Sequence, residues 1–366
     1  MRSVEPVIRP EAAVPLGPLT TLGIGGRARW LVRATTAEEV GAAHAWSRDE
    51  ALPLFVLGGG SNLVVADAGF DGVIVQIALA GLDVSRDGEE TVVRAGAGES
   101  WDTLVAAAVA RGLAGLECLS GIPGSVGGTP VQNVGAYGQE VAETIREVTV
   151  FDRTDARLTA ISRDRCGFAY RTSRFKREDA GRFVICDVRF ALRPGPATIT
   201  YPDVVREFEG RSAASVTLGE VRRAVLAIRR RKGMVIDPSD VDTRSVGSFF
   251  MNPVVAPDVR ERLASEARGP VPGFSMPDGT VKIPAAWLIE RAGFVRGYRH
   301  GRVGVSSKHP LALVNLGDAT ARELVALAVE IKRRVADRFG VGLRPEPAFV
   351  GFGDDPLVTY LQKDIG

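Results

Sequence analysis

The stretch GSFFMNP, residues 247–253, holds a serine at position 248 whose chemical role is not obvious. A serine acts as a nucleophile only when a base, usually a histidine, activates it. The chain has three histidines, and none of them lies in a triad motif or beside a G-x-S-x-G elbow. Ser248 is therefore either structural or a group that does something other than attack a carbonyl.

Two glycine-rich segments could bind a ligand that carries phosphates. Residues 58–62 read GGGSN directly after a predicted strand, so several backbone N–H groups can approach phosphate oxygens in succession. Residues 119–140 form a second such segment, too long for a neutral connector in a compact domain. Taken alone, the first segment could be a simple tight turn. Together, the two segments indicate an extended ligand such as a dinucleotide.

Two charged residues outside these segments are candidates for ligand contacts. Arg171 follows Tyr170 in an aromatic context, and arginine suits a carboxylate or phosphate in bidentate geometry. A structural ion pair explains this arginine equally well. Glu346 lies between two prolines that fix its backbone, but it could be an exposed turn acid. The basic run at 229–232 is typical of a helix C-terminus, although local binding of a diphosphate remains open.

Composition narrows the class of protein. The chain has 366 residues, which favours two or three domains, and 45% hydrophobic residues, as in soluble globular proteins. No apolar run approaches the roughly 20 residues that span a bilayer, and the N-terminus lacks a signal-peptide layout. A net charge of +2 gives no field to recruit nucleic acid. Three scattered cysteines argue against a disulfide framework and a zinc site, which favours the cytoplasm.

Periodicity and capping signals predict alternating strands and helices that must position these residues. The predicted strands are residues 28–34, 54–57, 73–77, 91–98, 145–153, 182–193 and 311–315. The predicted helices are those opened by capping boxes at Thr36–Glu39 and Thr217–Glu220, and residues 100–111, 257–267, 284–293 and 318–339, the last of which Gly340 ends. Residues 23–28 match the dinucleotide fingerprint G-x-G-x-x-A. A coil precedes them and a strand follows, so they fail its context test.

Several motifs together resemble those of the UDP-N-acetylenolpyruvoylglucosamine reductases, flavoproteins of bacterial cell-wall precursor synthesis. They occur in the family's order, over about residues 20–352: GGGSNLVV, GIPGSVGGTPVQNVGAYGQE, AYRTSRFK, RRRKGMVIDP, GSFFMNP, PAAWLIERAG, SSKHPLALVN and LRPEPAFV. The second motif and GSFF-x-NP are specific in combination. GGGSN alone also occurs in other FAD-linked oxidases.

The resemblance implies an α+β fold, with two FAD-binding domains of the vanillyl-alcohol-oxidase type and a third, substrate-binding α+β domain. The expected divisions are residues 1–82, 83–214 and 215–346, followed by a C-terminal strand and tail at 347–366. It also implies reduction of UDP-N-acetylglucosamine enolpyruvate to UDP-N-acetylmuramate, with tightly but non-covalently bound FAD and with NADPH as co-substrate. We expect a cytoplasmic monomer that binds neither nucleic acid nor membrane.

The family resemblance implies a role for each residue that matches one of the family's motifs. The catalytic positions are Ser248, Arg171 and Glu346. The FAD contacts are Gly58, Gly59, Gly60, Ser61, Asn62, Leu63, Ser120, Gly121, Gly124, Ser125, Gly127, Gly128, Thr129, Gln132, Asn133, Gly135, Ala136 and Tyr137. The substrate contacts are Tyr170, Lys232, Asn252, the tyrosine of a mobile loop at Tyr201, and Lys282, which a surface charge explains equally well. Pro202 and Met251 depart from the glycine and lysine that are usual in the family.

The chemistry that the resemblance implies gives these residues physical tasks. Flavin N5 delivers hydride to the terminal enolpyruvyl carbon, and negative charge then spreads from the adjacent carbon into the carboxylate. Arg171 suits the stabilisation of that charge, and Ser248 can donate a proton to the strongly basic carbon. An ionised Glu346 would oppose the reaction. It helps if it is protonated, or if it orients Arg171 or a water molecule.

Two other functions are compatible with parts of the pattern. Another FAD-linked oxidase or dehydrogenase of the same fold would share GGGSN, but many such enzymes tether the flavin through a histidine or cysteine. No such residue lies near residues 58–62, and GSFFMNP would be unexplained. A non-catalytic flavin- or nucleotide-sugar-binding module would not need Ser248, Arg171 and Glu346 together. A flavin spectrum and substrate-dependent oxidation of NADPH distinguish the three.

Overall fold

The structure of the chain, a computed structural model, describes residues 8–267 and 270–364. The chain forms two compact units, each assembled from pieces that are discontinuous in sequence. Unit 1 contains the residues up to Val14, Ala28–Gly60 and Asp71–Val235, and unit 2 contains Pro15–Arg27, Ser61–Phe70 and the residues from Ile236 onward. The four-part division expected from the family resemblance stays a prediction.

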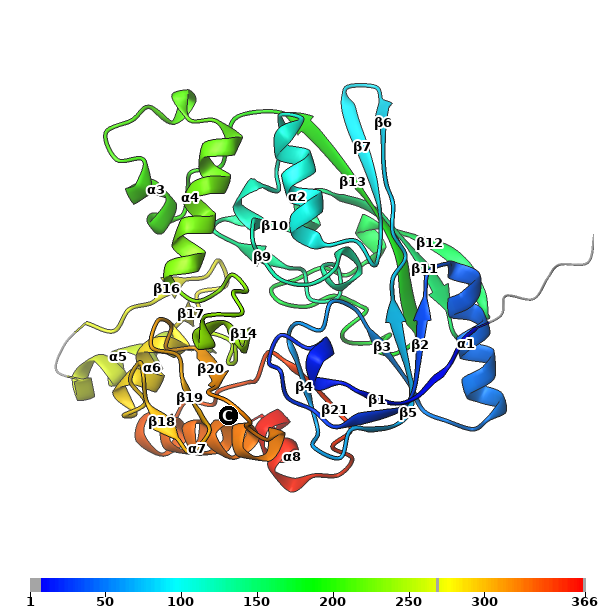
Figure 1. Cartoon of the computed structure of the whole chain (residues 1–366). Coiled ribbons are helices and arrows are strands. Elements are labelled where there is room, and N and C mark those ends of the chain that lie inside the picture. Colours follow the sequence, from blue (N-terminus) through cyan, green and yellow to red (C-terminus); the bar gives the residue numbers. More distant parts are fainter. Residues whose placement is uncertain (1–7, 268–269, 365–366) are drawn as a thin grey trace, which may run out of the picture. The chain divides into compact units, whose positions relative to one another are not determined.

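Among its described residues, unit 1 combines two main sheets and a small two-stranded sheet, β10-β9, with four α-helices (Figure 1). Its strands are β1 (Glu11–Pro15), β2 (Arg27–Ala34), β3 (Leu54–Leu57), β5 (Phe70–Ile77), β6 (Leu82–Asp87), β7 (Glu90–Gly96), β8 (Leu113–Ala114), β9 (Gly135–Ala136), β10 (Gln139–Glu140), β11 (Ile145–Asp152), β12 (Arg157–Ser162) and β13 (Phe183–Pro194). Its helices are α1 (Ala37–Asp49), α2 (Trp101–Ala110), α3 (Pro202–Glu207) and α4 (Leu218–Arg231).

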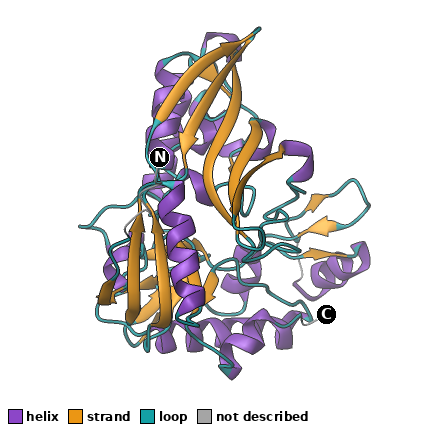
Figure 2. Cartoon of the chain, turned by 90° about the vertical axis from the view of Figure 1, so that its right-hand side faces the viewer, coloured by secondary structure: helices purple, strands orange, loops and turns teal. Residues whose placement is uncertain are grey.

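The two main sheets of unit 1 share one hydrophobic core. A four-stranded sheet has the order β1-β2-β5-β3, with β3 parallel to β5. The other sheet follows β12-β11-β13-β7-β6, and Figure 2 shows its long, twisted strands in orange. Trp101 of α2 is fully buried, packs with its ring tilted against that of Phe190 of β13, and donates its indole N–H to the carbonyl of Leu119 at 3.0 Å. This bond ties the second glycine-rich segment to the core.

Unit 2 is a smaller α+β assembly. Its strands are β4 (Leu63–Val65), β14 (Ser245–Ser248), β15 (Val254–Val255), β16 (Phe274–Ser275), β17 (Val281–Lys282), β18 (Arg299–His300), β19 (Val303–Val305), β20 (Ala312–Asn315) and β21 (Ala348–Val350). Its helices are α5 (Pro257–Ala267), α6 (Ala285–Arg291), α7 (Ala321–Phe339) and α8 (Pro356–Gln362).

Long-range pairing organises unit 2. Strand β14 pairs with β20 in the sheet β14-β20-β19-β18, while β4 from early in the chain pairs in parallel with β21 near its end. Helix α7 supplies much of the core through one apolar face, and α8 lies beside it (Figure 1). Lys332 on α7 is fully buried and donates to three backbone carbonyls at the end of α8.

Local signals set the helix boundaries. Both predicted capping boxes are present, at Thr36–Glu39 and at Thr217–Glu220. The predicted start of the long helix at residue 318 is wrong, because Asp318 has φ 50° and Thr320 is the N-cap, paired reciprocally with Glu323. Gly340 ends α7 in the left-handed conformation, as predicted.

Strand β2 follows the G-x-G-x-x-A match at residues 23–28, so the rejection of a dinucleotide fingerprint there is confirmed. Several elements of the described residues escape prediction, among them β6, β12 and α3. The burial pattern of β6 is almost entirely exposed and that of β12 is mostly exposed, so neither shows an apolar alternation. Helix α3 begins at Pro202, which occupies the first helical position.

Candidate functional site

The two glycine-rich segments approach each other closely within unit 1. Strand β3 ends at Leu57 and leads into Gly58–Gly60. A Cβ placed on Gly59 would lie 2.7 Å from the Cα of Gly124 and 2.8 Å from the backbone nitrogen of Ser125. Only glycine permits this approach of one backbone to the other. The expectation that the two segments serve one ligand is therefore compatible with their geometry.

Ser125 has the properties expected of a ligand contact. Its side chain is buried at 7% exposure, and its Oγ has no hydrogen-bond partner among the described residues. A Cβ on Gly58 would lie 2.8 Å from this Oγ. An unsatisfied buried hydroxyl costs free energy unless a bound molecule completes its hydrogen bonds. A phosphate-bearing cofactor such as FAD fits this site, because it would supply the missing acceptor beside two glycine backbones.

Several predicted FAD contacts have polar groups already used inside the protein. Asn133 donates from Nδ2 to Glu140 at 2.7 Å and accepts from the backbone of Ala142. The hydroxyls of Ser120 and Thr129 donate to backbone carbonyls three residues earlier. These side chains shape the segment, so a ligand there would meet mainly backbone groups and Ser125.

Unusual backbone conformations gather on predicted site residues. Of the eight described non-glycine residues with positive φ, four are predicted site residues. These are Asn62, Asn133, Tyr137 and Arg171, with φ of 54°, 44°, 51° and 54°. Each such residue costs about 1 kcal/mol or more, and such strain concentrates at functional sites. Arg171 sits in a tight turn in which Ala169 and Thr172 exchange backbone hydrogen bonds.

A partly buried polar network at the start of the second glycine segment was not predicted. Arg222 of α4 forms two bonds to the carboxylate of Asp102, at 2.7 and 2.8 Å, and the same carboxylate accepts the N–H of Gly121 at 2.6 Å. Burial works to raise the pKa of Asp102, but these bonds hold it below its ordinary value. One helix therefore fixes the start of the glycine segment.

The same helix also reaches the end of that segment. Arg229 is 9% exposed and donates to the carbonyl of Met234 at 2.8 Å, and its positive charge acts on Tyr137, where it works to lower the pKa of the phenol. Burial lowers the pKa of Arg229 and raises that of Tyr137. Sequence reasoning did not select Arg229 as a site residue. The one signal in the sequence that could have indicated it is its position three residues before the predicted substrate contact Lys232.

The predicted substrate contacts of unit 1 lie in two groups. Tyr201 is the N-cap of α3, and its ring meets the ring of Tyr137 edge to face, with the ring centroids 5.4 Å apart. Lys232 forms a 2.6 Å ion pair with Asp203, and its Nζ lies 5.8 Å from the centre of the Tyr137 ring. In the other group, the guanidinium of Arg171 lies 5.7 Å from the Tyr170 ring.

Unit 2 brings Ser248 and Glu346 onto adjacent backbone segments. Ser248 ends β14, half-buried, and Phe249 and Phe250 behind it are buried at 0% and 1% exposure. The N–H of Glu346 donates to the carbonyl of Phe249 at 2.9 Å, and Phe250 bridges to Pro345. The two buried phenylalanines therefore support this turn from the core side.

Asn62 joins this part of unit 2, so the predicted stretch 58–63 is divided between the two units. Its Nδ2 donates to the carbonyl of Glu346 at 3.4 Å, and its carbonyl accepts the N–H of Ala348 at 3.1 Å. Asn252 uses its Oδ1 to accept the N–H of Ala285 at 2.9 Å, which anchors the start of α6. Lys282 lies in β17, opposite Val254.

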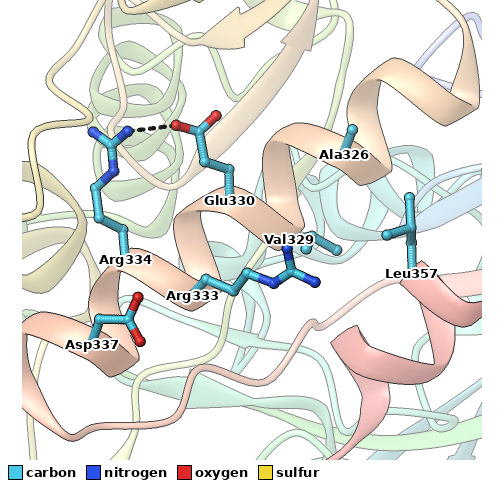
Figure 3. Close-up of a pocket in the computed structure, with 7 residues that line it drawn as sticks. All are labelled: Ala326, Val329, Glu330, Arg333, Arg334, Asp337 and Leu357. Carbon is cyan, nitrogen blue, oxygen red and sulfur yellow. Dashed lines mark hydrogen bonds and ion pairs between the residues drawn. The ribbon is translucent and has the colours of Figure 1, made fainter.

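Other features of the described residues lie away from these groups. Figure 3 shows a groove of about 360 Å³ on α7 and Leu357, where Arg334 pairs with Glu330; it contains no predicted site residue. No three His, Cys, Asp or Glu side chains within residues 8–267 and 270–364 gather as a metal site. In the same ranges, no helix has the length and apolar character needed to cross a membrane.

The three cysteines are free and buried, so none is a candidate nucleophile. Burial raises the pKa of Cys118 and Cys186 to about 12 and that of Cys166 to about 11. A thiol with so high a pKa stays protonated near neutral pH.

Comparison with known proteins gives a consistent result. Residues 28–161 match the model of an FAD binding domain, and residues 237–350 match that of the UDP-N-acetylenolpyruvoylglucosamine reductase C-terminal domain. The chain is 49% identical to the UDP-N-acetylenolpyruvoylglucosamine reductase of Thermobifida fusca, over 92% of this chain and 97% of that protein. It is 47% identical to that of Streptomyces coelicolor, over 96% and 92%.

A solved structure supports the same assignment. The crystal structure of the reductase from Thermus caldophilus covers 94% of this chain and 100% of its own, with a TM-score of 0.63 and 28% identity. The fold is accordingly α+β, with FAD-binding domains of the vanillyl-alcohol-oxidase type followed by a third domain. The chain belongs to the UDP-N-acetylenolpyruvoylglucosamine reductase family.

Proposed function

We propose that this chain reduces UDP-N-acetylglucosamine enolpyruvate to UDP-N-acetylmuramate, with FAD as cofactor and NADPH as co-substrate, for peptidoglycan precursor synthesis. Near-full-length identity to reductases of that name supports the reaction. The structural observation that carries it is the environment of Ser248. It ends a strand, rests on two buried phenylalanines, and lies beside the backbone of Glu346.

The residues proposed to hold FAD are Gly58–Leu63 and Ser120–Tyr137. When bound, FAD accepts a hydride from NADPH and supplies it to the enolpyruvyl double bond. The unsatisfied Oγ of Ser125 and the close glycine backbones supply donors suited to its phosphates. No histidine or cysteine lies within residues 58–63, which is compatible with non-covalent binding.

Arg171 and Ser248 have complementary proposed tasks. Arg171 binds the substrate carboxylate and stabilises the negative charge that spreads into it. The strained φ of 54° at this residue is maintained by the backbone bonds of its turn, so the direction in which the side chain leaves the backbone is fixed. Ser248 donates its hydroxyl proton to the basic carbon, a task that needs no histidine.

Glu346 completes the proposed catalytic set. Its backbone is held by Phe249 and by Asn62, which fixes the position from which its carboxyl group can act. It promotes the reaction if it is protonated when charge develops, or if it orients a neighbouring group or water.

We assign the nucleotide part of the substrate to Tyr170, Lys232, Asn252, Lys282 and Tyr201, and we propose that this chain is one of the family members that carry a substrate-capping tyrosine. Asn252 retains its Nδ2 for this purpose, because only its Oδ1 is used by α6. We also propose that the protein acts as a cytoplasmic monomer.

One experiment tests the proposal. The purified full-length protein should show a flavin spectrum, and its oxidation of NADPH should depend on the enolpyruvyl nucleotide. In Ser248→Ala, NADPH should still reduce the flavin, whereas transfer to the substrate should slow by about 100-fold or more. The first half-reaction is an internal control for folding. NADPH consumption indifferent to the substrate favours another FAD-linked oxidase, and normal turnover in the variant removes Ser248 from the mechanism.

A further inference from the structure

Helix α3 presents acidic side chains to the basic end of α4. The carboxylate of Asp203 forms a 2.6 Å ion pair with Lys232, and it also contacts Arg206. Glu207, one turn later, pairs with Arg231. The two helices lie side by side (Figure 1). Two of the cations in the basic run 229–232 are thus neutralised from within the protein.

The attachment of α3 is slight in comparison with that of α4. Among the six residues of α3, only Val204 is buried, and it joins a small cluster with Val221, Val225 and Ile228 of α4. Tyr201 and Val205 are 41% and 44% exposed. Burial of one valine stabilises a helix far less than burial of a whole apolar face, so displacement of this helix costs little compared with opening a core.

The surroundings of Lys232 are those of an anion site. Its Nζ lies 5.8 Å from the centre of the Tyr137 ring, and the buried, positively charged Arg229 acts electrostatically on that same tyrosine. Burial favours the neutral form of Asp203, yet Lys232 and Arg206 hold its pKa below the ordinary value. Asp203 is therefore an anion at neutral pH, and its oxygen occupies a position that a phosphate oxygen could take.

We propose that Asp203 determines affinity and specificity by holding Lys232, so that only a ligand with a doubly charged diphosphate displaces it. The inference rests on the proposed function in one respect, namely that Lys232 contacts the diphosphate of the nucleotide. Any ligand that binds Lys232 must first break the Asp203–Lys232 ion pair, and this reduces the free energy gained on binding. A nucleoside diphosphate overcomes this cost because it offers more charge and more acceptor oxygens to Lys232 than one carboxylate does. An uncharged nucleoside gains nothing from Lys232 and leaves the ion pair in place.

The test is calorimetric titration of UDP, and of uridine as an uncharged comparison, into the full-length protein as purified with its flavin. In Asp203→Asn, UDP should bind about fivefold more tightly, or about 1 kcal/mol, the value of a partly exposed ion pair. Uridine affinity should be unchanged. The matched control is Glu209→Gln, which removes the same charge from the same segment; the carboxylate of Glu209 makes no ion pair among the described residues.

A double-mutant cycle separates competition at Lys232 from a general effect of charge. In a Lys232→Met background, Asp203→Asn should leave UDP affinity unchanged within about 1.5-fold. Weaker UDP binding by Asp203→Asn would show that Asp203 instead orients Lys232, and would overturn the proposal. An equal gain in Glu209→Gln, or a gain that persists in the Lys232→Met background, would also overturn it.

The same proteins separate this inference from the proposed function. Substrate-dependent NADPH oxidation by the unmodified protein tests the reductase activity. If that activity is present but Asp203→Asn gains no affinity for UDP, only the role of Asp203 fails. If the activity is absent, the proposed function fails, and the UDP titrations still decide whether Asp203 competes for Lys232.

Discussion

A methyl group added at Gly59 tests whether the close approach of the two glycine segments serves cofactor binding. The new Cβ would lie 2.7 Å from the Cα of Gly124, whereas ordinary contacts begin at 3.4 Å. The segments must therefore move apart by about 0.7 Å. The atoms concerned belong to the backbone, so no side-chain rotation relieves the contact. Overpacking of this kind costs roughly 1–3 kcal/mol.

We expect this cost to appear in FAD affinity, because the displaced backbone carries the N–H groups proposed to bind the phosphates. A cost of about 2 kcal/mol corresponds to about 30-fold weaker binding. The measurement is a fluorescence titration of flavin-depleted Gly59→Ala with FAD, together with the flavin absorbance per protein after purification.

The matched control is Gly195→Ala, also in unit 1. Its Cβ would lie 3.5 Å from Ala114, an ordinary contact, so its FAD affinity should equal that of the unmodified protein. Thermal unfolding of both variants shows whether the fold is retained. If Gly59→Ala folds and binds FAD as tightly as the control, the close approach does not serve the cofactor and the reasoning is refuted.

Two further predictions concern stability. Lys332→Met should lower the free energy of unfolding by about 2 kcal/mol in chemical denaturation, because three carbonyls at the end of α8 lose their donor. As a control, substitution of the exposed neighbouring residue, Arg333→Met, should change the free energy of unfolding by no more than about 0.5 kcal/mol. Equal losses in the two variants would contradict the prediction. Arg182 holds the pKa of buried Asp152 at about 2 in the folded protein, whereas the pKa of an aspartate in the unfolded chain is about 3.9. The ionised carboxylate therefore stabilises the fold at pH values above about 3.9, and this stabilisation is lost as the pH falls towards 2. Arg182→Gln should raise the pH midpoint of acid unfolding, followed by circular dichroism, and an unchanged midpoint would count against the ion pair.

Local signals made several elements predictable from the sequence. A capping box needs only four residues, so the starts of α1 and α4 could be inferred from Thr36 and Thr217. The start predicted for α7, residue 318, lies two residues before its N-cap, although Thr320 and Glu323 form the same four-residue signal as the other two capping boxes. The edge strands β6 and β12 carry exposed side chains, and without a buried face they show no alternation to recognise.

Pairing between distant charges could not be predicted. Asp102 and Arg222 meet across 120 positions in the chain, and nothing near Asp102 indicates that it receives the N–H of Gly121. Asp203 directly follows the proline that opens α3, but its partner Lys232 depends on how α3 packs on α4. Sequence motifs can therefore identify the residues that could contact a ligand. The residues that hold these ligand contacts in place can be identified only from the tertiary structure.

Because β4 pairs with β21, unit 2 cannot complete its fold until the C-terminal part of the chain has been synthesised. Leu63 emerges long before its partner Ala348, by tens of seconds at roughly 5–20 residues per second. All three residues of β4 are buried in the finished fold, so a nascent chain carries an unpaired apolar strand throughout that interval. Unit 1 has all its residues once Val235 is made, but unit 2 has to wait for Val350. A chain that stops between these two points can complete unit 1 and still expose β4, which makes it a substrate for chaperones and a source of aggregation.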